Sequence, residues 1–128
     1  MRTILCLVLC CGAGVIAWAA EERAPSPDAR HGQRLFLYCA ACHSIAAGEP
    51  DKVGPNLHGM IGAPAGTRGT FQYSEALKTS GLVWTDDVLD AWLKQPTALV
   101  PRTKMAFIGL AKAQDRADLL AYLKQAAR

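Results

Sequence analysis

The residues best suited to chemistry lie in one short run, Cys39-Ala40-Ala41-Cys42-His43. The pattern C-x-x-C-H is the attachment signature of c-type haem. The two thiols add across the two vinyl groups of one porphyrin, and one helical turn between the cysteines matches the separation of those groups. The adjacent histidine then presents its imidazole to the iron as the proximal ligand. We therefore predict one covalently bound haem c, attached through Cys39 and Cys42 and ligated by His43.

Three other roles for this cysteine pair are less well supported. A zinc site usually takes four protein ligands, but the chain has no second C-x-x-C and no H-x-x-x-H spacing to complete one. A thioredoxin-like redox pair belongs near a βαβ pattern, and none surrounds the motif. A structural disulfide between Cys39 and Cys42 would close a very small loop and add little stability. Haem attachment is the favoured interpretation.

Residues 1–19 are predicted to be a signal peptide. A positive start at Met1-Arg2 precedes an apolar run, and Ala17-Trp18-Ala19 places small residues where a signal peptidase reads the chain, so cleavage before Ala20 is expected. The alternative is an uncleaved membrane anchor, because the apolar run is at the short end of the length that spans a bilayer. Only in that case would the protein be attached to a membrane.

Cleavage would remove Cys6, Cys10 and Cys11 and leave only the cysteines of the motif. This suits an oxidising compartment, because no further thiol remains to mispair. We therefore expect a periplasmic protein, or one in the intermembrane space if the source is not bacterial. Residues 20–27 are predicted to form a flexible leader, and residues 28–128 one domain.

The charge balance argues against one class of partner. The chain carries 14 basic and 11 acidic side chains, a net charge of +3, and has no basic run or arginine-rich helix. Nucleic-acid-binding proteins usually concentrate basic residues on one face. No nucleic-acid partner is therefore expected.

The pattern of caps and apolar spacing predicts an all-α domain. Ser26 as cap and Pro27 at the first position begin a helix that runs to about Ala40, with the cysteine motif as its last turn. Further helices are expected over residues 74–79, from a start at 85–87 until Pro96, and over 114–127.

The remaining segments are predicted to be irregular. Residues 44–70 are rich in glycine and have no helical or alternating pattern, and 102–111 form a second loop. Residues 96–101 are too few for more than a turn, and 82–84 are the only plausible extended stretch. A loop as long as 44–70 is unusual unless it wraps something. The expected fold has three to five helices, with long loops wrapped around one haem.

A second axial ligand would decide what the iron does, because an open sixth position binds gases or substrates and a filled one passes electrons. The candidates are Met105, Met60 and His58. Met105 lies in a loop, where it is not needed for helix packing. Met60 and His58 closely follow the segment that would brace His43.

Several motifs in order along residues 28–125 resemble those of a class I cytochrome c, of the soluble bacterial and mitochondrial type. The stretches that carry the resemblance are Gly32-Gln33-Arg34-Leu35-Phe36, the C-x-x-C-H run, Gly54-Pro55-Asn56-Leu57-His58-Gly59, Tyr73-Ser74-Glu75-Ala76-Leu77, Gly81-Leu82-Val83-Trp84, Pro101-Arg102-Thr103-Lys104-Met105 and residues 116–124. An ordered set at family spacing is far more specific than C-x-x-C-H alone.

The resemblance implies roles for matching residues. His43 and Met105 would be the axial ligands, and the Pro55 carbonyl would accept a hydrogen bond from the other imidazole nitrogen of His43. Tyr73 and Trp84 would hydrogen-bond the inner haem propionate. Thr103 would help to seal the haem crevice, and Phe36 would pack with Leu119 and Tyr122 where the first and last helices meet.

Three positions depart from the family pattern. The arginine that often follows the glycine at Gly62 is Ala63 here, so the propionate is expected to depend more on Trp84 and Tyr73. Trp92 stands where a tyrosine is common, and Leu77 replaces a frequent polar residue. The change at Trp92 removes a phenol that could tune the iron–sulfur bond, and the change at Leu77 predicts a drier pocket.

The function that the resemblance implies is one-electron transfer, with no enzymatic activity. A monomeric carrier would shuttle electrons between larger respiratory or photosynthetic complexes, with a cytochrome bc complex as donor and a terminal oxidase, reductase or reaction centre as acceptor. Arg34, Lys52, Lys104 and Lys112 are candidates for a charged rim around the haem edge. The alternatives are a haem ligand sensor or enzyme with a displaceable sixth ligand, and a docked or anchored haem subunit of a redox complex.

Overall fold

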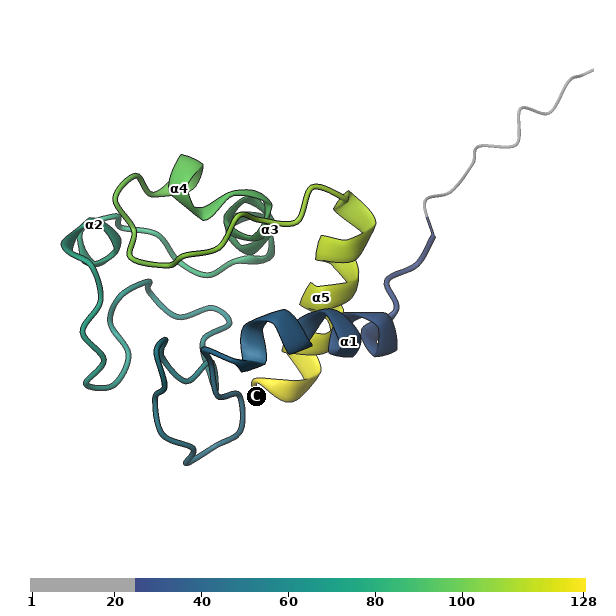
Figure 1. The fold of residues 1–128 in the computed structure, drawn as a ribbon, viewed down its shortest axis with the longest axis horizontal. Helices are drawn as coiled ribbons and strands as arrows, with labels where there is room; N and C mark the ends of the chain where they lie inside the picture. The colour runs from purple at the N-terminus through teal and green to yellow at the C-terminus, as the bar shows by residue number, and fades with distance from the viewer. Residues whose placement is uncertain (1–24) are drawn as a thin grey trace, which may run out of the picture.

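The computed structural model describes residues 25–128 and contains five α-helices and no β-strand in that range (Figure 1). The helices are α1 (Ala29–Ala40), α2 (Glu75–Lys78), α3 (Asp86–Lys94), α4 (Pro96–Leu99) and α5 (Ala113–Ala126). The predicted all-α class is confirmed. The predicted signal peptide and most of the leader lie outside the described residues. None of the helices in residues 25–128 is long and apolar enough to cross a bilayer.

Helix α1 begins later than the sequence predicted. Its cap is Asp28 and not Ser26, because the Asp28 carboxylate accepts a hydrogen bond from the Arg30 N–H at 2.9 Å. The backbone N–H of Asp28 also donates to the Asp118 carboxylate at 2.8 Å. This contact with α5 fixes Asp28 at the helix start, and a reading of local caps alone misses it.

The cysteine motif straddles the end of α1. Cys39 lies in the last turn, and the N–H groups of Cys42 and His43 both donate to the Cys39 carbonyl at 2.9 Å. The Lys52 ammonium donates to the Ala40 carbonyl at 2.8 Å. A cation at this end of a helix interacts favourably with its unpaired carbonyls and its dipole. The motif is therefore held by the helix on one side and by a lysine cap on the other.

The first and last helices cross at Gly32, as Figure 1 shows for α1 and α5. A Cβ atom at Gly32 would overlap the Asp118 carbonyl and lie 2.9 Å from the Tyr122 Cβ. Next to this crossing, the rings of Phe36 and Tyr122 pack with centroids 5.5 Å apart. Phe36 also shares a buried cluster with Leu119. The predicted contact between the helices is confirmed.

The shorter helices follow their caps. Ser74 caps α2 and Thr85 caps α3, each through its side-chain oxygen, and the start of α3 is the one predicted. After α3, where no more than a turn was expected, Pro96 begins the short helix α4. Proline is favoured at a first helical position because its fixed φ suits the helix and its missing N–H is not needed there. Gln95, with a φ of −167°, turns the chain between the two helices.

The long loop contains no helix or strand but is tied to the rest of the domain. Pro64 and Val83 form an isolated antiparallel bridge, which is where the predicted extended stretch lies. On one side of it, the Trp84 N–H donates to the Ala63 carbonyl at 3.0 Å. The loop therefore borders the core cluster that contains Trp84.

The Asp118 carboxylate joins the start of α1 to α5 at the helix crossing. Its side chain is buried and accepts hydrogen bonds from the Asp28 N–H, from Gln114 at 2.8 Å and from His31 at 2.7 Å. Burial raises the pKa of Asp118, but the hydrogen bonds from Asp28, His31 and Gln114 outweigh it and leave the pKa below its ordinary value. The native state therefore favours the ionised carboxylate.

We expect Asp118→Asn to destabilise the protein by about 1–3 kcal/mol at neutral pH, because it removes the charged acceptor of three half-buried hydrogen bonds. A carboxyl whose folded-state pKa is lowered contributes stability above its unfolded pKa and loses it as the pH falls through the folded value. The free energy of unfolding should therefore fall less steeply in acid for Asp118→Asn than for the wild type. Denaturant titrations over a pH series measure both effects.

The matched control is Asp115→Asn, because the Asp115 carboxylate lies 3.9 Å from the same His31 nitrogen, outside hydrogen-bonding distance. Asp115→Asn should change the free energy of unfolding and its dependence on pH less than Asp118→Asn does. Equal effects of the two variants would show that the negative charge of this surface, and not the hydrogen bonds of Asp118, stabilises the crossing.

Candidate functional site

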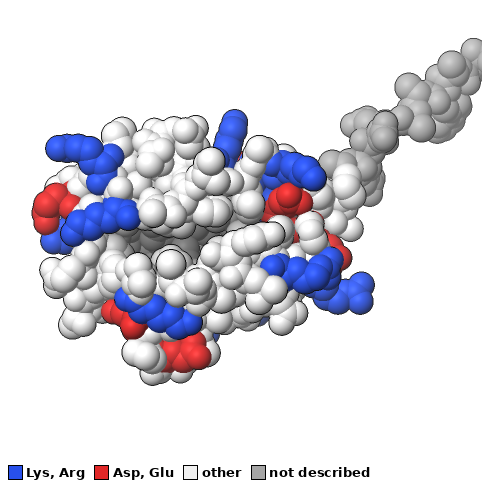
Figure 2. All heavy atoms as spheres, viewed as in Figure 1, with Lys and Arg blue, Asp and Glu red and all other residues white. Residues whose placement is uncertain are grey.

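One large cleft runs through the domain and contains the cysteine motif. Its empty space is about 1420 Å³, including the solvent at its mouth, and Figure 2 shows the hollow on one face of the molecule. All the residues that the sequence singled out for haem line it: Cys39, Cys42, His43, Pro55, Tyr73, Trp84, Thr103 and Met105. Most of the other lining side chains are apolar, which is typical of cofactor sites.

The His43 ring is held in one orientation. Its Nδ1 lies 2.8 Å from the Pro55 carbonyl. Because a carbonyl only accepts, Nδ1 carries the proton and Nε2 keeps its lone pair. Burial lowers the pKa of His43, the Pro55 hydrogen bond raises it and the charge of Lys52 lowers it, with a net decrease. The ring is therefore a neutral imidazole, the form that binds metal.

Gly54 leaves room for the His43 ring because it has no side chain. A Cβ atom there would lie 2.8 Å from both ring nitrogens of His43, closer than real Cβ atoms approach. The Gly54 N–H donates to the Cys42 carbonyl at 2.7 Å, so the chain returns directly to the motif. In the sequence, Gly54 stands out only as part of a family motif. Its steric role depends on a contact that sequence spacing does not reveal.

Asn56 holds the loop that carries Pro55. Its side-chain amide donates to the carbonyls of Ala46 and Glu49, both at 2.8 Å, and its backbone N–H donates to the Asp51 carboxylate at 2.7 Å. These bonds fix a stretch of the long loop that lacks secondary structure. The Pro55 carbonyl therefore points at His43 from a rigid support.

The two thiols are available for covalent attachment. Both are free cysteines, with Cys39 half-buried and Cys42 exposed. Burial, and secondarily the neighbouring Cys42, raise the pKa of Cys39. In residues 25–128 there is no group of three or more His, Cys, Asp or Glu side chains that could hold a metal ion. The two thiols therefore have no such cluster beside them in the described part of the chain.

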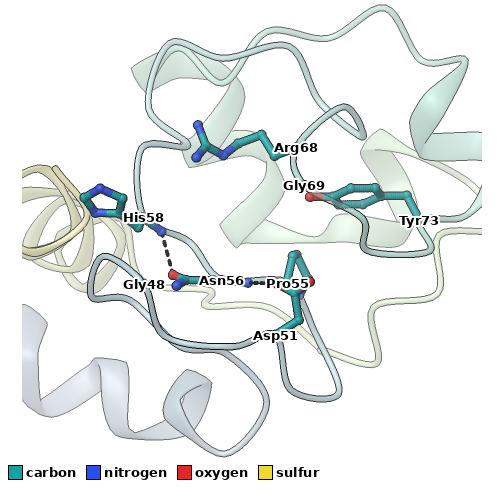
Figure 3. A pocket seen from close by; sticks show the side chains of 8 residues that line it. All are labelled: Gly48, Asp51, Pro55, Asn56, His58, Arg68, Gly69 and Tyr73. Carbon is teal, nitrogen blue, oxygen red and sulfur yellow. Dashed lines mark hydrogen bonds between the residues drawn. The ribbon is translucent and has the colours of Figure 1, made fainter.

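The candidates for the second axial ligand lie in different places. Met105 and Met60 both line the cleft. His58 lines a smaller neighbouring pocket instead (Figure 3). Met60 is 9% exposed and belongs to a buried core cluster, whereas Met105 comes from a loop and is only partly buried against that cluster. The structure does not bring His58 to the cleft with the motif.

The remaining wall of the cleft is apolar. The rings of Trp84 and Trp92 meet edge to face with centroids 5.2 Å apart, and Leu77 is 7% exposed beside them in the same cluster. Burial, and after it the charge of Asp51, raise the pKa of Tyr73, more than its contacts with Arg68 lower it. The phenol therefore remains a hydrogen-bond donor.

The four basic candidates for the rim lie in different surroundings. Of the four basic candidates, only Lys104 lines the cleft. The Lys52 ammonium is engaged by main-chain carbonyls, and Arg34 donates to the Arg30 carbonyl at 3.2 Å. Two exposed side chains that do not stand out in the sequence, Tyr38 (75% exposed) and Val53 (81% exposed), also line the cleft.

Two thiols, an oriented imidazole and an apolar cleft in an all-α domain define a protein that binds one haem covalently. Comparison with known proteins agrees. The family model for cytochrome c matches residues 29–127. Cytochrome c2 of Blastochloris viridis is 43% identical over 107 residues, which cover 84% of each chain. Cytochrome c of Theileria parva is 48% identical over 103 residues, covering 80% of this chain and 89% of that one.

A solved structure agrees as well. Cytochrome cH from Methylobacterium extorquens superposes with a TM-score of 0.73 at 42% identity, covering 77% of this chain and 98% of that chain. The chain belongs to the cytochrome c family. It is an electron carrier with one covalently attached haem c, and is not an enzyme.

We expect Gly54→Ala to disturb the His43 ring, because the added methyl group occupies space that the imidazole fills. Overpacking of this kind lowers the free energy of unfolding by about 1–3 kcal/mol. In the haem-loaded protein it should also shift the visible spectrum and the midpoint potential. Gly48→Ala is the control, because nothing lies within 4 Å of a Cβ atom at that position.

Gly48 has a φ of +77°, so its substitution carries backbone strain without steric overlap. It should lower stability but leave the spectrum unchanged. A normal spectrum for Gly54→Ala would show that this close approach does not set the orientation of the ring.

Proposed function

We propose that this protein is a periplasmic one-electron carrier whose haem iron is ligated by His43 and Met105. The observation that carries the proposal is that both residues line one apolar cleft with the attachment cysteines, while Nε2 of His43 is left free by the Pro55 hydrogen bond. Cys39 and Cys42 would form the two thioether bonds. The haem supplies a one-electron iron couple. The chain contributes the axial ligands, an apolar environment and the orientation of the haem.

Met105 is preferred to Met60 for a structural reason. Met60 fills the core cluster around Trp84 and Leu89, where its removal from packing would leave a void. Met105 belongs to a loop outside the helices and is free to turn inward without such a loss. A thioether is a soft ligand that favours reduced iron. It therefore raises the potential and closes the sixth position.

The polar residues of the cleft complete the proposed site. Tyr73 and Trp84 would donate hydrogen bonds to a propionate, since a buried indole N–H or phenol needs a partner. Thr103 would close the crevice beside the methionine, and its hydroxyl lies 3.4 Å from the Met105 N–H. The chain would thus use few polar groups, each on the wall of an otherwise apolar cleft.

The proposed partners are membrane redox complexes. A cytochrome bc complex would be the donor, and a terminal oxidase, reductase or reaction centre the acceptor, with the protein acting as a monomer. Relatives named cytochrome c2 from Blastochloris viridis and Rhodomicrobium vannielii support a bacterial carrier of this kind. Export through residues 1–19 would place it in the periplasm.

Met105→Ala in the haem-loaded protein should open the sixth position. We expect loss of the thioether-to-iron band of the ferric spectrum, a lower midpoint potential and rapid binding of carbon monoxide by the ferrous form. The matched variant is Met60→Leu, which conserves volume and should cost less than about 1.5 kcal/mol in stability. It should leave the ferric spectrum unchanged.

The two methionine variants separate the candidate ligands. Loss of the band in Met60→Leu and its retention in Met105→Ala would assign the ligand to Met60. Rapid carbon monoxide binding by the wild type would contradict a closed site and favour a ligand sensor.

The N-terminus of the mature protein provides a separate check. Expression with the haem-attachment machinery should yield a periplasmic protein whose intact mass corresponds to residues 20–128 plus one haem, because cleavage is expected after Ala19. A membrane fraction containing residue 1 would instead identify an anchored protein. The spectrum is expected to be the same in both cases, so this result is independent of the axial ligands.

A further inference from the structure

Arg68 is the only arginine in the part of the cleft wall that the structure describes. The other basic side chain that lines the cleft, apart from the His43 ligand, is Lys104, which is exposed at the mouth. Arg68 is half-buried and lines two cavities, the haem cleft and the small pocket drawn in Figure 3. A guanidinium in so apolar a site needs an explanation, because a buried charge is unfavourable unless it is paired.

The guanidinium is seated on Gly59. One of its nitrogens, Nη1, donates to the Gly59 carbonyl. A Cβ atom at Gly59 would lie 3.0 Å from Nη1, 3.1 Å from Nη2 and 3.3 Å from Cζ, so the group packs closely against the glycine. The side chain is therefore held in place, and it does not sample the solvent freely as a surface arginine does.

Most of its hydrogen-bonding capacity is unused. A guanidinium has five N–H donors, and the bond to Gly59 takes one. No carboxylate of residues 25–128 lies within 4.0 Å of it. Asp51 lines the same small pocket, but Figure 3 shows it on the opposite side from Arg68, and its carboxylate accepts the Asn56 N–H. Residues 25–128 therefore provide no anionic partner for Arg68.

The haem c of this family supplies the missing anion, since it carries two propionate carboxylates. Tyr73 and Trp84, which are proposed to donate to one of them, line the same cleft as Arg68. The position where the family often has an arginine is Ala63, which does not line the cleft; its carbonyl accepts the Trp84 N–H. A cation is thus absent at residue 63 and present at residue 68.

We propose that Arg68 is the cationic partner of the inner haem propionate and takes the place of the arginine absent at Ala63. The inference rests on the proposed haem site. Arg68 would contact the propionate and would not ligate the iron, so it is a positioning residue that also tunes the midpoint potential. It keeps the propionate ionised in an apolar cleft, and its positive charge disfavours the oxidised iron.

Arg68→Gln in the haem-loaded protein tests this directly. The pKa of the propionate, read from the pH dependence of the midpoint potential and of the haem proton resonances, should rise by about 1 unit or more, because an adjacent cation is lost. The midpoint potential should fall at pH values above that pKa. Arg68→Lys keeps the charge but not the planar guanidinium. Its propionate pKa and midpoint potential should therefore lie between those of the wild type and Arg68→Gln.

Two further variants separate this role from general effects. Arg30→Gln removes the same charge from a side chain that is 90% exposed, and it should leave the propionate pKa unchanged. Ala63→Arg combined with Arg68→Gln moves the cation to the other position, and it should restore the low propionate pKa. Loss of the Gly59 contact alone would lower the stability of the protein, and Ala63→Arg would not restore that stability.

The outcomes distinguish the inference from the function on which it rests. If Arg68→Gln matches Arg30→Gln in propionate pKa and potential, Arg68 only supports Gly59 and the inference is wrong. The ferric thioether band should persist in every Arg68 variant. Its absence in the wild type would instead reject the proposed ligation by Met105, and the propionate pKa would still report on Arg68.

Discussion

The hydrogen bond from His43 to the Pro55 carbonyl is the contact on which the site depends. It fixes one tautomer and one ring orientation, and it leaves the second nitrogen for the iron. A histidine directly after a helix end would otherwise rotate. The contact requires Gly54 to lie flat against the ring and Asn56 to hold the loop. A segment without secondary structure is therefore held in place by specific side-chain contacts.

The cleft also explains why the helices are few and the loops long. Helices α1 and α5 bury their own apolar faces at the Gly32 crossing, while the loops, α2 and α3 line much of the cleft. A cleft of this size lined by apolar side chains stabilises the fold poorly if water fills it. A bound haem removes that apolar surface from water. Cofactor binding and folding are therefore coupled, because a ligand that binds only the native state stabilises it.

Much of this could be predicted from the sequence because the signals are local. The C-x-x-C-H run, the Ser74 and Thr85 caps and the apolar spacing of the last helix depend on residues close in the chain. The start of α1 could not be predicted in this way, because Asp28 is selected by Asp118 across the helix crossing. The fit of Gly54 against His43 is likewise a contact between segments.

The same distinction applies to the charged residues. Lys52, Lys104 and Arg68 look alike as exposed cations in a sequence, but the structure gives each a different surrounding. Lys52 caps the end of α1, Lys104 stands at the mouth of the cleft, and Arg68 lies against Gly59 inside it. Their effect on an iron within the cleft therefore differs with burial, because water screens an exposed charge far more than a half-buried one. The potential of the carrier therefore depends on where its charges lie as well as on the iron ligands, and the net charge of +3 does not report this.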